Sequence, residues 1–263
     1  MTASLALTDT PTAAEEAAVR GALSEANAAA GFPHDSRRLA VLLRDADGAV
    51  AGGLWGRTGW SWLYVENLAV PPALRGAGLG GRILGMAEAE ARARGCIGSR
   101  LDTYSFQARG FYEKRGYALA GEIADCPPGQ TRWTMTRRLD GEATAEAWPD
   151  AAAPRALIAP GSGRWDAGLA AIEQGLAAFN GTFAGPPGHH PVHLVVRRPG
   201  ELRAAGGLAG HVLYRWLFVR GFWLAEDLRR GGLGTALLAR AEREAAALGC
   251  VGVLLSTFSF QAR

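Results

Sequence analysis

Residues 75–80 read Arg75-Gly76-Ala77-Gly78-Leu79-Gly80, and residues 229–234 read Arg229-Arg230-Gly231-Gly232-Leu233-Gly234. We call these stretches the first and the second cradle. Both keep the spacing Arg-x-x-Gly-x-Gly at the start of a run of helix-forming residues. Glycine lets the backbone approach a ligand closely, and the first N–H groups of a helix have no partner inside the helix. Together with the positive end of the helix dipole, such a turn favours a diphosphate.

The two cradles belong to an internal repeat of the whole chain. Gly52 and Gly206, Arg75 and Arg229, and Gly95 and Gly249 are each 154 residues apart. The sequence Ser-Phe-Gln-Ala-Arg at 105–109 returns without a gap at 259–263. We therefore expect two copies of one fold.

The repeat predicts the domain boundaries. The first domain is expected at residues 1–140 and the second at 156–263, joined by a linker at 141–155 that is rich in Ala, Glu and Pro. By comparison with the first copy, the second domain is expected to lack its last helix and its last two strands.

Hydrophobic periodicity and turn residues predict a mixed α/β fold, with a twisted mixed sheet flanked by helices in each domain. A capping box at Thr12 and Glu15 predicts a helix to about Ala30, with a counterpart at 165–179. The other expected helices of the first domain cover 78–94 and 107–114. Its expected strands cover 39–44, 49–57, 60–70, 96–101, 117–123 and 131–138.

A second interpretation of the first cradle is a dinucleotide site. Residues 76–81 fit Gly-x-Gly-x-x-Gly, and Asp102 follows about twenty residues later, after a strand. The second copy does not keep this pattern, and Ser256 stands in the place of Asp102. A dinucleotide turn also follows its strand directly, whereas residues 71–75 intervene here. An ordinary helix start would explain one glycine but not the duplicated spacing.

Composition excludes several classes of protein. A formal net charge of +3 without a Lys/Arg block argues against a nucleic-acid binder. No apolar run long enough for a membrane span and no secretory signal are visible, so a cytoplasmic location is expected. An odd set of three cysteines without paired spacing argues against disulfides and zinc, and no metal site is expected.

Three stretches of the chain resemble the GNAT superfamily of acyl-CoA N-acetyltransferases. The Arg-x-x-Gly-x-Gly spacing is similar to the pyrophosphate motif of these enzymes, residues 105–117 to their second signature, and residues 125–132 to the closing hairpin of a bacterial subgroup. The resemblance implies acetyl-CoA as acyl donor and a primary amine of a small molecule as acceptor. It also implies direct attack in a ternary complex, with the first domain catalytic.

The resemblance also implies roles for particular residues. Tyr112 would give a proton to the CoA thiolate, and Glu66 would serve as base, on one strand face with Tyr64 and Leu68 by alternation. Alternatively, Tyr112 only packs and Glu66 is only solvated. Ser105 would contact the pantetheine arm, together with main-chain groups of two equivalent segments: Leu68, Ala69 and Val70, and Phe222, Trp223 and Leu224.

The second copy differs at both catalytic positions. Arg220 stands where the first copy has Glu66, and the chain contains no second counterpart of Tyr112. For the second domain, acyl-CoA binding or an assembly role without catalysis is therefore the alternative prediction.

Overall fold

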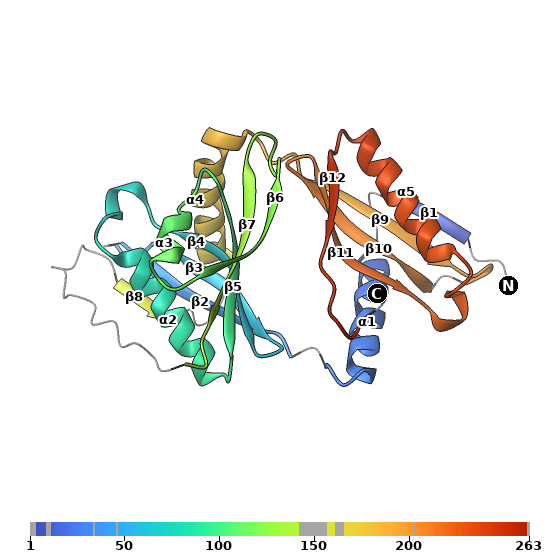
Figure 1. Ribbon diagram of the computed structural model, residues 1–263, viewed down its shortest axis with the longest axis horizontal. Coiled ribbons are helices and arrows are strands. Elements are labelled where there is room, and N and C mark those ends of the chain that lie inside the picture. The colour runs from blue at the N-terminus through green and yellow to red at the C-terminus, as the bar shows by residue number, and fades with distance from the viewer. Residues whose placement is uncertain are drawn as a thin grey trace. The chain divides into compact units, whose positions relative to one another are not determined.

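The computed structural model describes residues 4–8, 12–33, 35–45, 47–141, 157–160, 166–201 and 203–261 (Figure 1). The chain forms two compact units. One consists mainly of Met1–His34 and Pro186–Arg263, and the other mainly of Asp35–Asp125 and Gly129–Gly185. We call them the second-cradle unit and the first-cradle unit, after the turn that each contains.

The first-cradle unit is built on a sheet of seven described strands in the order β6-β7-β5-β4-β3-β2-β8. All neighbouring strands are antiparallel except β4 and β5, which are parallel. The strands are β2 (Arg37–Arg44), β3 (Val50–Gly59), β4 (Trp62–Ala69), β5 (Gly98–Tyr104), β6 (Ala118–Ala124), β7 (Thr131–Arg138) and β8 (Leu157–Pro160). Its helices are α2 (Leu79–Ala93), α3 (Arg109–Glu113) and α4 (Asp166–Ala184).

The second-cradle unit has a sheet of five described strands in the order β1-β9-β10-β11-β12, with β12 at its edge. Only β11 and β12 are parallel. The strands are β1 (Ser4–Thr8), β9 (His190–Arg197), β10 (Ala204–Leu213), β11 (Trp216–Leu224) and β12 (Gly252–Leu255), with helices α1 (Ala13–Ala29) and α5 (Leu233–Ala247). The predicted mixed sheets flanked by helices are confirmed.

Each unit takes its first strand and first helix from the other repeat. Strand β8 of the second repeat pairs with β2, while β1 of the first repeat pairs with β9. Helix α4 accordingly packs on β3 and β4, and α1 packs on β10 and β11 (Figure 1). The compact units therefore do not coincide with the repeats at 1–140 and 156–263.

Equivalent side chains seat the two exchanged helices. A Cβ atom at Gly53 would lie 3.3 Å from Ile172 Cδ1 of α4, and one at Gly207 would lie 3.2 Å from Val19 Cγ2 of α1. Both glycines have positive φ angles, +139° and +157°. Because a side chain there would meet a neighbouring strand carbonyl at 2.3 Å, only glycine lets sheet and helix come this close.

A polar contact is duplicated in the same way. Gln107 Nε2 donates to Asn180 Oδ1 of α4 at 2.8 Å, and Gln261 Nε2 donates to Asn27 Oδ1 of α1 at 3.1 Å. In each pair the glutamine comes from one repeat and the asparagine from the other. Both exchanges thus use the same hydrogen bond.

Most predicted elements agree with the structure to within a few residues, but the strand expected at 60–70 begins two residues late. Trp60 and Ser61 have φ angles of +48° and +59° and form the turn between β3 and β4. Tyr214 and Arg215 repeat this turn between β10 and β11. Two-residue hairpin turns favour positive φ angles because their twist matches that of the strands.

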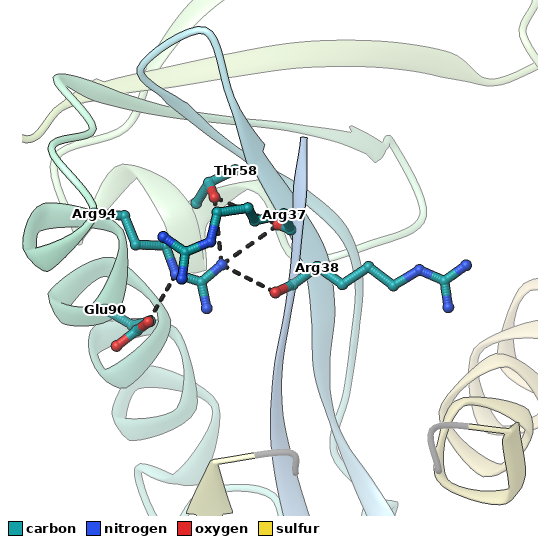
Figure 2. A network of polar contacts seen from close by, with 5 residues as sticks. All are labelled: Arg37, Arg38, Thr58, Glu90 and Arg94. Atoms are coloured by element: carbon teal, nitrogen blue, oxygen red, sulfur yellow. Dashed lines mark hydrogen bonds and ion pairs between the residues drawn. The ribbon is translucent and has the colours of Figure 1, made fainter. Parts of the chain in front are cut away.

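Helix α2 is fixed on the sheet at its C-terminal end by Arg94 (Figure 2). The Arg94 guanidinium donates to the main-chain oxygen of Arg38 at 2.9 Å and to Thr58 Oγ1 at 3.3 Å, and its Nε donates to Glu90 at 2.7 Å. Along the helix, Ile83 and Leu84 are fully buried in the core. These contacts set the direction of the helix whose other end is the first cradle.

A buried polar network holds the segment after α3. Tyr117 Oη donates to Glu88 Oε1 of α2 at 2.8 Å and lies 2.7 Å from Ser99 Oγ of β5. Arg137 donates to the second oxygen of Glu88 at 2.9 Å. Because the Tyr117 N–H also donates to the Tyr112 carbonyl at 3.1 Å, this network positions α3.

The exchange of helices α1 and α4 between the repeats predicts which engineered cysteine pairs can be cross-linked. In a Cys250→Ser background, Gln107→Cys with Asn180→Cys should react with a short bismaleimide, and the linked peptides can be identified by mass spectrometry. Gln107→Cys with Asn27→Cys is the matched control and should not link. The reverse result would show that each helix packs on the sheet of its own repeat.

Candidate active site

Strands β4 and β5 part beside the first cradle. Their parallel ladder joins Trp62–Val65 to Gly98–Leu101 and ends there. Beyond it, β4 stays paired with β3 up to Ala69, and β5 stays paired with β7 up to Tyr104. The facing edges of the two strands therefore diverge and leave main-chain groups that an extended ligand can pair with.

A β-bulge stands at the point where the strands part. Gly56 of β3 faces Val65 and Trp55 faces Asn67, so no β3 residue stands directly opposite Glu66 in the strand register. In the second-cradle unit, Gly210 of β10 faces Val219 and Ala209 faces Gly221, so no β10 residue stands opposite Arg220. The β11–β12 ladder likewise ends at Val219. A bulge bends its strand and increases the twist, which accounts for the divergence in both units.

The bulge also changes which side chains share a face of β4. Leu68 packs against the same core as Val65, rather than lying on one face with Glu66. Glu66 lies on the side of Tyr64, since Arg57 contacts both residues. The prediction that Leu68 shares a face with Glu66 was therefore wrong, because the extra residue shifts the alternation by one.

The first cradle forms a tight turn between a 3₁₀ turn (Pro72–Leu74) and α2. Gly76 and Gly78 have φ angles of +84° and +76°. Gly78 is the N-cap without a side-chain cap, and the Arg82 N–H donates to its carbonyl at 3.1 Å. The N–H groups of Leu79 and the two following glycines therefore have no partner within the helix.

The second cradle has the same backbone. Arg230 and Gly232 have φ angles of +65° and +82°, and the Ala236 N–H donates to the Gly232 carbonyl at 3.0 Å. Arg230 takes the left-handed conformation at the place of Gly76, although only glycine adopts it without strain. The turn therefore keeps its shape where its sequence changes.

The arginine of each cradle joins the end of a strand to the turn. Arg75 Nε donates to the Val70 carbonyl at 2.9 Å, and Arg229 Nε donates to the Leu224 carbonyl at 2.8 Å. Sequence reasoning assigned only charge to these residues. Because Nε alone makes this bond, the Nη groups of the exposed Arg75 can still serve an anion.

Tyr112 lies on α3, next to the first turn of α2. A Cβ atom on Gly80 would be 3.3 Å from the Phe111 ring, so the two helices are in close contact. The Tyr112 ring packs edge-on against Phe111 and Tyr117, with centroids 5.0 Å and 5.8 Å away. Burial raises the pKa of Tyr112 to about 12, despite an opposing effect of Arg115, so the phenol is neutral at physiological pH.

The other two predicted side chains have partners within the protein. Glu66, with 31% of its side chain exposed, accepts a hydrogen bond from Arg57 Nη1 at 2.7 Å. The Ser105 hydroxyl donates to Gln130 Oε1 and accepts from the Thr131 N–H at 3.0 Å, which ties the end of β5 to β7. Neither contact by itself identifies a ligand.

The surroundings of the second cradle are more acidic. Its preceding 3₁₀ turn (Glu226–Leu228) begins with Glu226 and Asp227, where the first has Pro72 and Ala73. Arg198 donates to both Asp227 carboxylate oxygens, at 2.8 Å and 3.0 Å, and lowers the pKa of that group. One of the two acids is therefore neutralised by an ion pair.

Asp102, the acidic residue that the dinucleotide interpretation requires, is engaged by neighbouring side chains. Asp102 is bound by Arg132 Nη2 at 2.6 Å and by Thr134 Oγ1. Burial raises the pKa of Asp102, but these partners outweigh it and keep the pKa below its usual value. The carboxylate is thus engaged inside the sheet instead of being presented to a ribose.

Metal-ligand clusters and membrane-spanning helices are both absent from the residues that the structure describes. Among these residues no group of three or more His, Cys, Asp or Glu side chains is arranged to hold a metal ion. None of the helices that the structure describes has the length and apolar character of a membrane span.

Comparisons with known proteins agree with this geometry. The model of the acetyltransferase (GNAT) family matches residues 9–117 and 164–262. A blasticidin-S acetyltransferase of Streptomyces morookaense is 50% identical over 35% of this chain and 68% of its own length. An acetyltransferase of Agrobacterium fabrum is 39% identical over 51% of this chain and 97% of its own length.

One solved structure of similar sequence comes from the same genus as the second of these relatives. An acetyltransferase from Agrobacterium tumefaciens is 39% identical and covers 50% of this chain and 96% of its own, with a TM-score of 0.47. The family model matches both repeats, and each match includes one cradle. The chain is therefore an acetyltransferase of the GNAT family, with two copies of the family's fold.

Proposed function

We propose that this chain is an acetyl-CoA-dependent N-acetyltransferase that acetylates a primary amine of a small molecule by direct attack in a ternary complex. The observation that carries the proposal is the parting of β4 and β5 beside the first cradle, with Tyr112 on the adjoining α3. The 50% identity to a protein named for blasticidin S supports a small-molecule acceptor.

The residues of the first-cradle unit fit acetyl-CoA. The N–H groups at the start of α2, with Arg75, suit its diphosphate. The edge of β4 at Leu68 and Ala69, continued by the N–H of Val70, suits the pantetheine arm, because β5 pairs with β4 only up to Val65. The Val70 carbonyl is held by Arg75. When bound, the cofactor supplies an activated acetyl thioester. An N–H of the same edge can donate to the thioester oxygen as negative charge develops there.

Tyr112 serves as the acid in this proposal. A phenol keeps its proton at working pH, and burial raises the pKa of Tyr112 further, to about 12. Tyr112 can therefore give that proton to the departing thiolate. Phe111 and Tyr117 hold the ring in place.

Glu66 serves as the base. An alkyl amine with a pKa of about 10.4 costs roughly 4–5 kcal/mol to deprotonate at pH 7. Glu66 stands at the bulge where the strands part, and its carboxylate can take the proton directly or through water. Arg57 fixes the orientation of the carboxylate.

For the second cradle we propose acyl-CoA binding without catalysis. The identical backbone of Arg229–Gly234, with the strand edge at Phe222, Trp223 and Leu224, supports binding. Arg220 in place of Glu66 removes the base and puts a cation at the bulge. Only the first-cradle unit would then turn over substrate.

A carboxylate at the N-cap should weaken cofactor binding at one cradle. Gly78→Asp caps the free N–H groups and repels the diphosphate, so acetyl-CoA affinity at that site should fall by roughly tenfold or more, about 1.4 kcal/mol. Gly232→Asp is the matched control. Calorimetry should show two sites of comparable affinity in the wild type and one weakened site in each variant, with activity at subsaturating acetyl-CoA lowered only in Gly78→Asp. Full acetyl-CoA binding by Gly78→Asp would contradict the assignment.

Removing the phenol oxygen should slow the reaction and leave binding unchanged. Tyr112→Phe keeps the ring contacts, so the melting temperature and acetyl-CoA affinity should hold while kcat falls about 10²–10³-fold. Because the raised pKa of about 12 keeps the phenol protonated, wild-type kcat should show no loss of this acid between pH 7 and 10. An unchanged kcat in Tyr112→Phe would leave only the packing role.

Glu66→Gln should lower kcat/KM by about 10²-fold at pH 7. The loss should shrink as the pH rises towards the pKa of the acceptor, because more of the amine is then already neutral. The control is Glu122→Gln, an exposed glutamate on β6, which should leave the profile unchanged. A deficit that is independent of pH would argue against a base at Glu66.

A further inference from the structure

Helix α4 contacts the ends of both strands that part at the site. The Phe179 ring lies 5.0 Å from the guanidinium of Arg75, which follows β4. The Phe183 ring lies 5.5 Å from that of Phe106, which follows β5. A single helix, contributed by the second repeat, therefore contacts the segments that follow both strands.

Four aromatic rings follow one another from the end of β5 to α4, and we call them the aromatic ladder: Tyr104, Phe106, Phe183 and Phe179. Consecutive centroids are 5.3 Å, 5.5 Å and 5.2 Å apart, and the first three rings are parallel to within 10° of their neighbours. Phe183 is 54% exposed, although it is a large apolar side chain. Phe183 thus presents much of its ring to solvent, on the helix that also contacts Arg75 of the first cradle.

The acceptor must approach from the face of the sheet that carries the ladder. Leu54 of β3 is fully buried in the core formed with α2, and its neighbour Gly53 faces Ile172 of α4. Adjacent strand residues point to opposite faces, so α2 and α4 cover opposite faces of the sheet. The α2 face is filled by core side chains, which leaves the α4 face for a substrate.

We propose that Phe179 and Phe183 of the second repeat form the acceptor wall of the active site in the first-cradle unit, and that the acceptor amine is attached to a flat ring. A planar ring can pack against the exposed part of the Phe183 ring, since both offset and edge-on arrangements suit aromatic pairs. The proposal rests on the proposed function, because it names the acceptor class for the same site.

The second-cradle unit contains a matching ladder and thereby supplies a control. Phe258 and Phe260 stack at 5.3 Å, and Phe260 stacks on Phe32 at 4.0 Å. Phe32 follows α1, comes from the first repeat and is 42% exposed. It is the closest structural match to Phe183 in a unit where we propose no turnover.

Two amines that differ only in ring planarity test the proposal: 2-phenylethylamine and 2-cyclohexylethylamine. The wild type should prefer the flat amine by tenfold or more in kcat/KM, and Phe183→Ala should abolish this preference through KM, with unchanged acetyl-CoA affinity. Phe183→Trp should restore it, and Phe32→Ala should have no effect. No preference in the wild type, or full preference in Phe183→Ala, would overturn the proposal.

A binding experiment separates this proposal from the proposed function. Binding of 2-phenylethylamine to the CoA-loaded protein is measured by saturation-transfer NMR, which needs no turnover. Binding that is lost in Phe183→Ala, without acetylation by the wild type, would support the acceptor wall and contradict the proposed transfer to this amine. Acetylation of both amines with no dependence on Phe183 would do the opposite.

Discussion

The site depends on one extra residue in a strand. No β3 residue stands opposite Glu66 in the strand register. The resulting bulge bends β4 away from β5 at the end of their shared ladder. Without it, the parallel pair would continue and no main-chain edge would be free for an extended ligand. Arg220 shows that the bulge depends on the backbone and not on the side chain, since the geometry survives a reversal of charge.

The cradle is built around that divergence. Arg75 ties the strand end to the turn, Arg94 fixes the far end of α2, and α3 packs on its first turn. The helix start thus has a fixed position relative to the strand edge. A diphosphate and an extended arm can then be held by parts of one rigid frame, which is the preorganisation that acyl transfer requires.

Much of this could be predicted from the sequence, because the decisive signals are local or duplicated. The cradle spacing, the helix after it and the order of strands follow from glycine positions and periodicity, and the repeat removed the dinucleotide alternative. The bulge at Glu66 could not be predicted, since the strand contains no glycine or proline there and alternation alone gave Leu68 the wrong face. Gly56 and Gly210, opposite the bulges, and Gly221, next to Arg220 in the second one, are local signals that the sequence does contain.

The exchange of β1–α1 and β8–α4 was also beyond sequence reasoning. Each repeat contains the same strand and helix pattern, so both pairings bury equivalent residues, such as Val19 or Ile172 against a glycine. Periodicity determines that a helix covers the sheet but not which copy supplies it. The roles proposed for Tyr112, Glu66 and Ser105 came from the family signature, and the structure adds their neighbours rather than their chemistry.

The exchange of β1–α1 and β8–α4 links the sequence changes that the two repeats can accept. A substitution within residues 166–184 acts on the unit that carries the first cradle, although it lies beyond the linker in the gene. The two repeats therefore cannot change their sequences independently. A substitution in the sheet of one repeat must remain compatible with the helix that the other repeat contributes to the same unit. Duplication here produced two mutually dependent units, and selection on one reaction reaches into both copies.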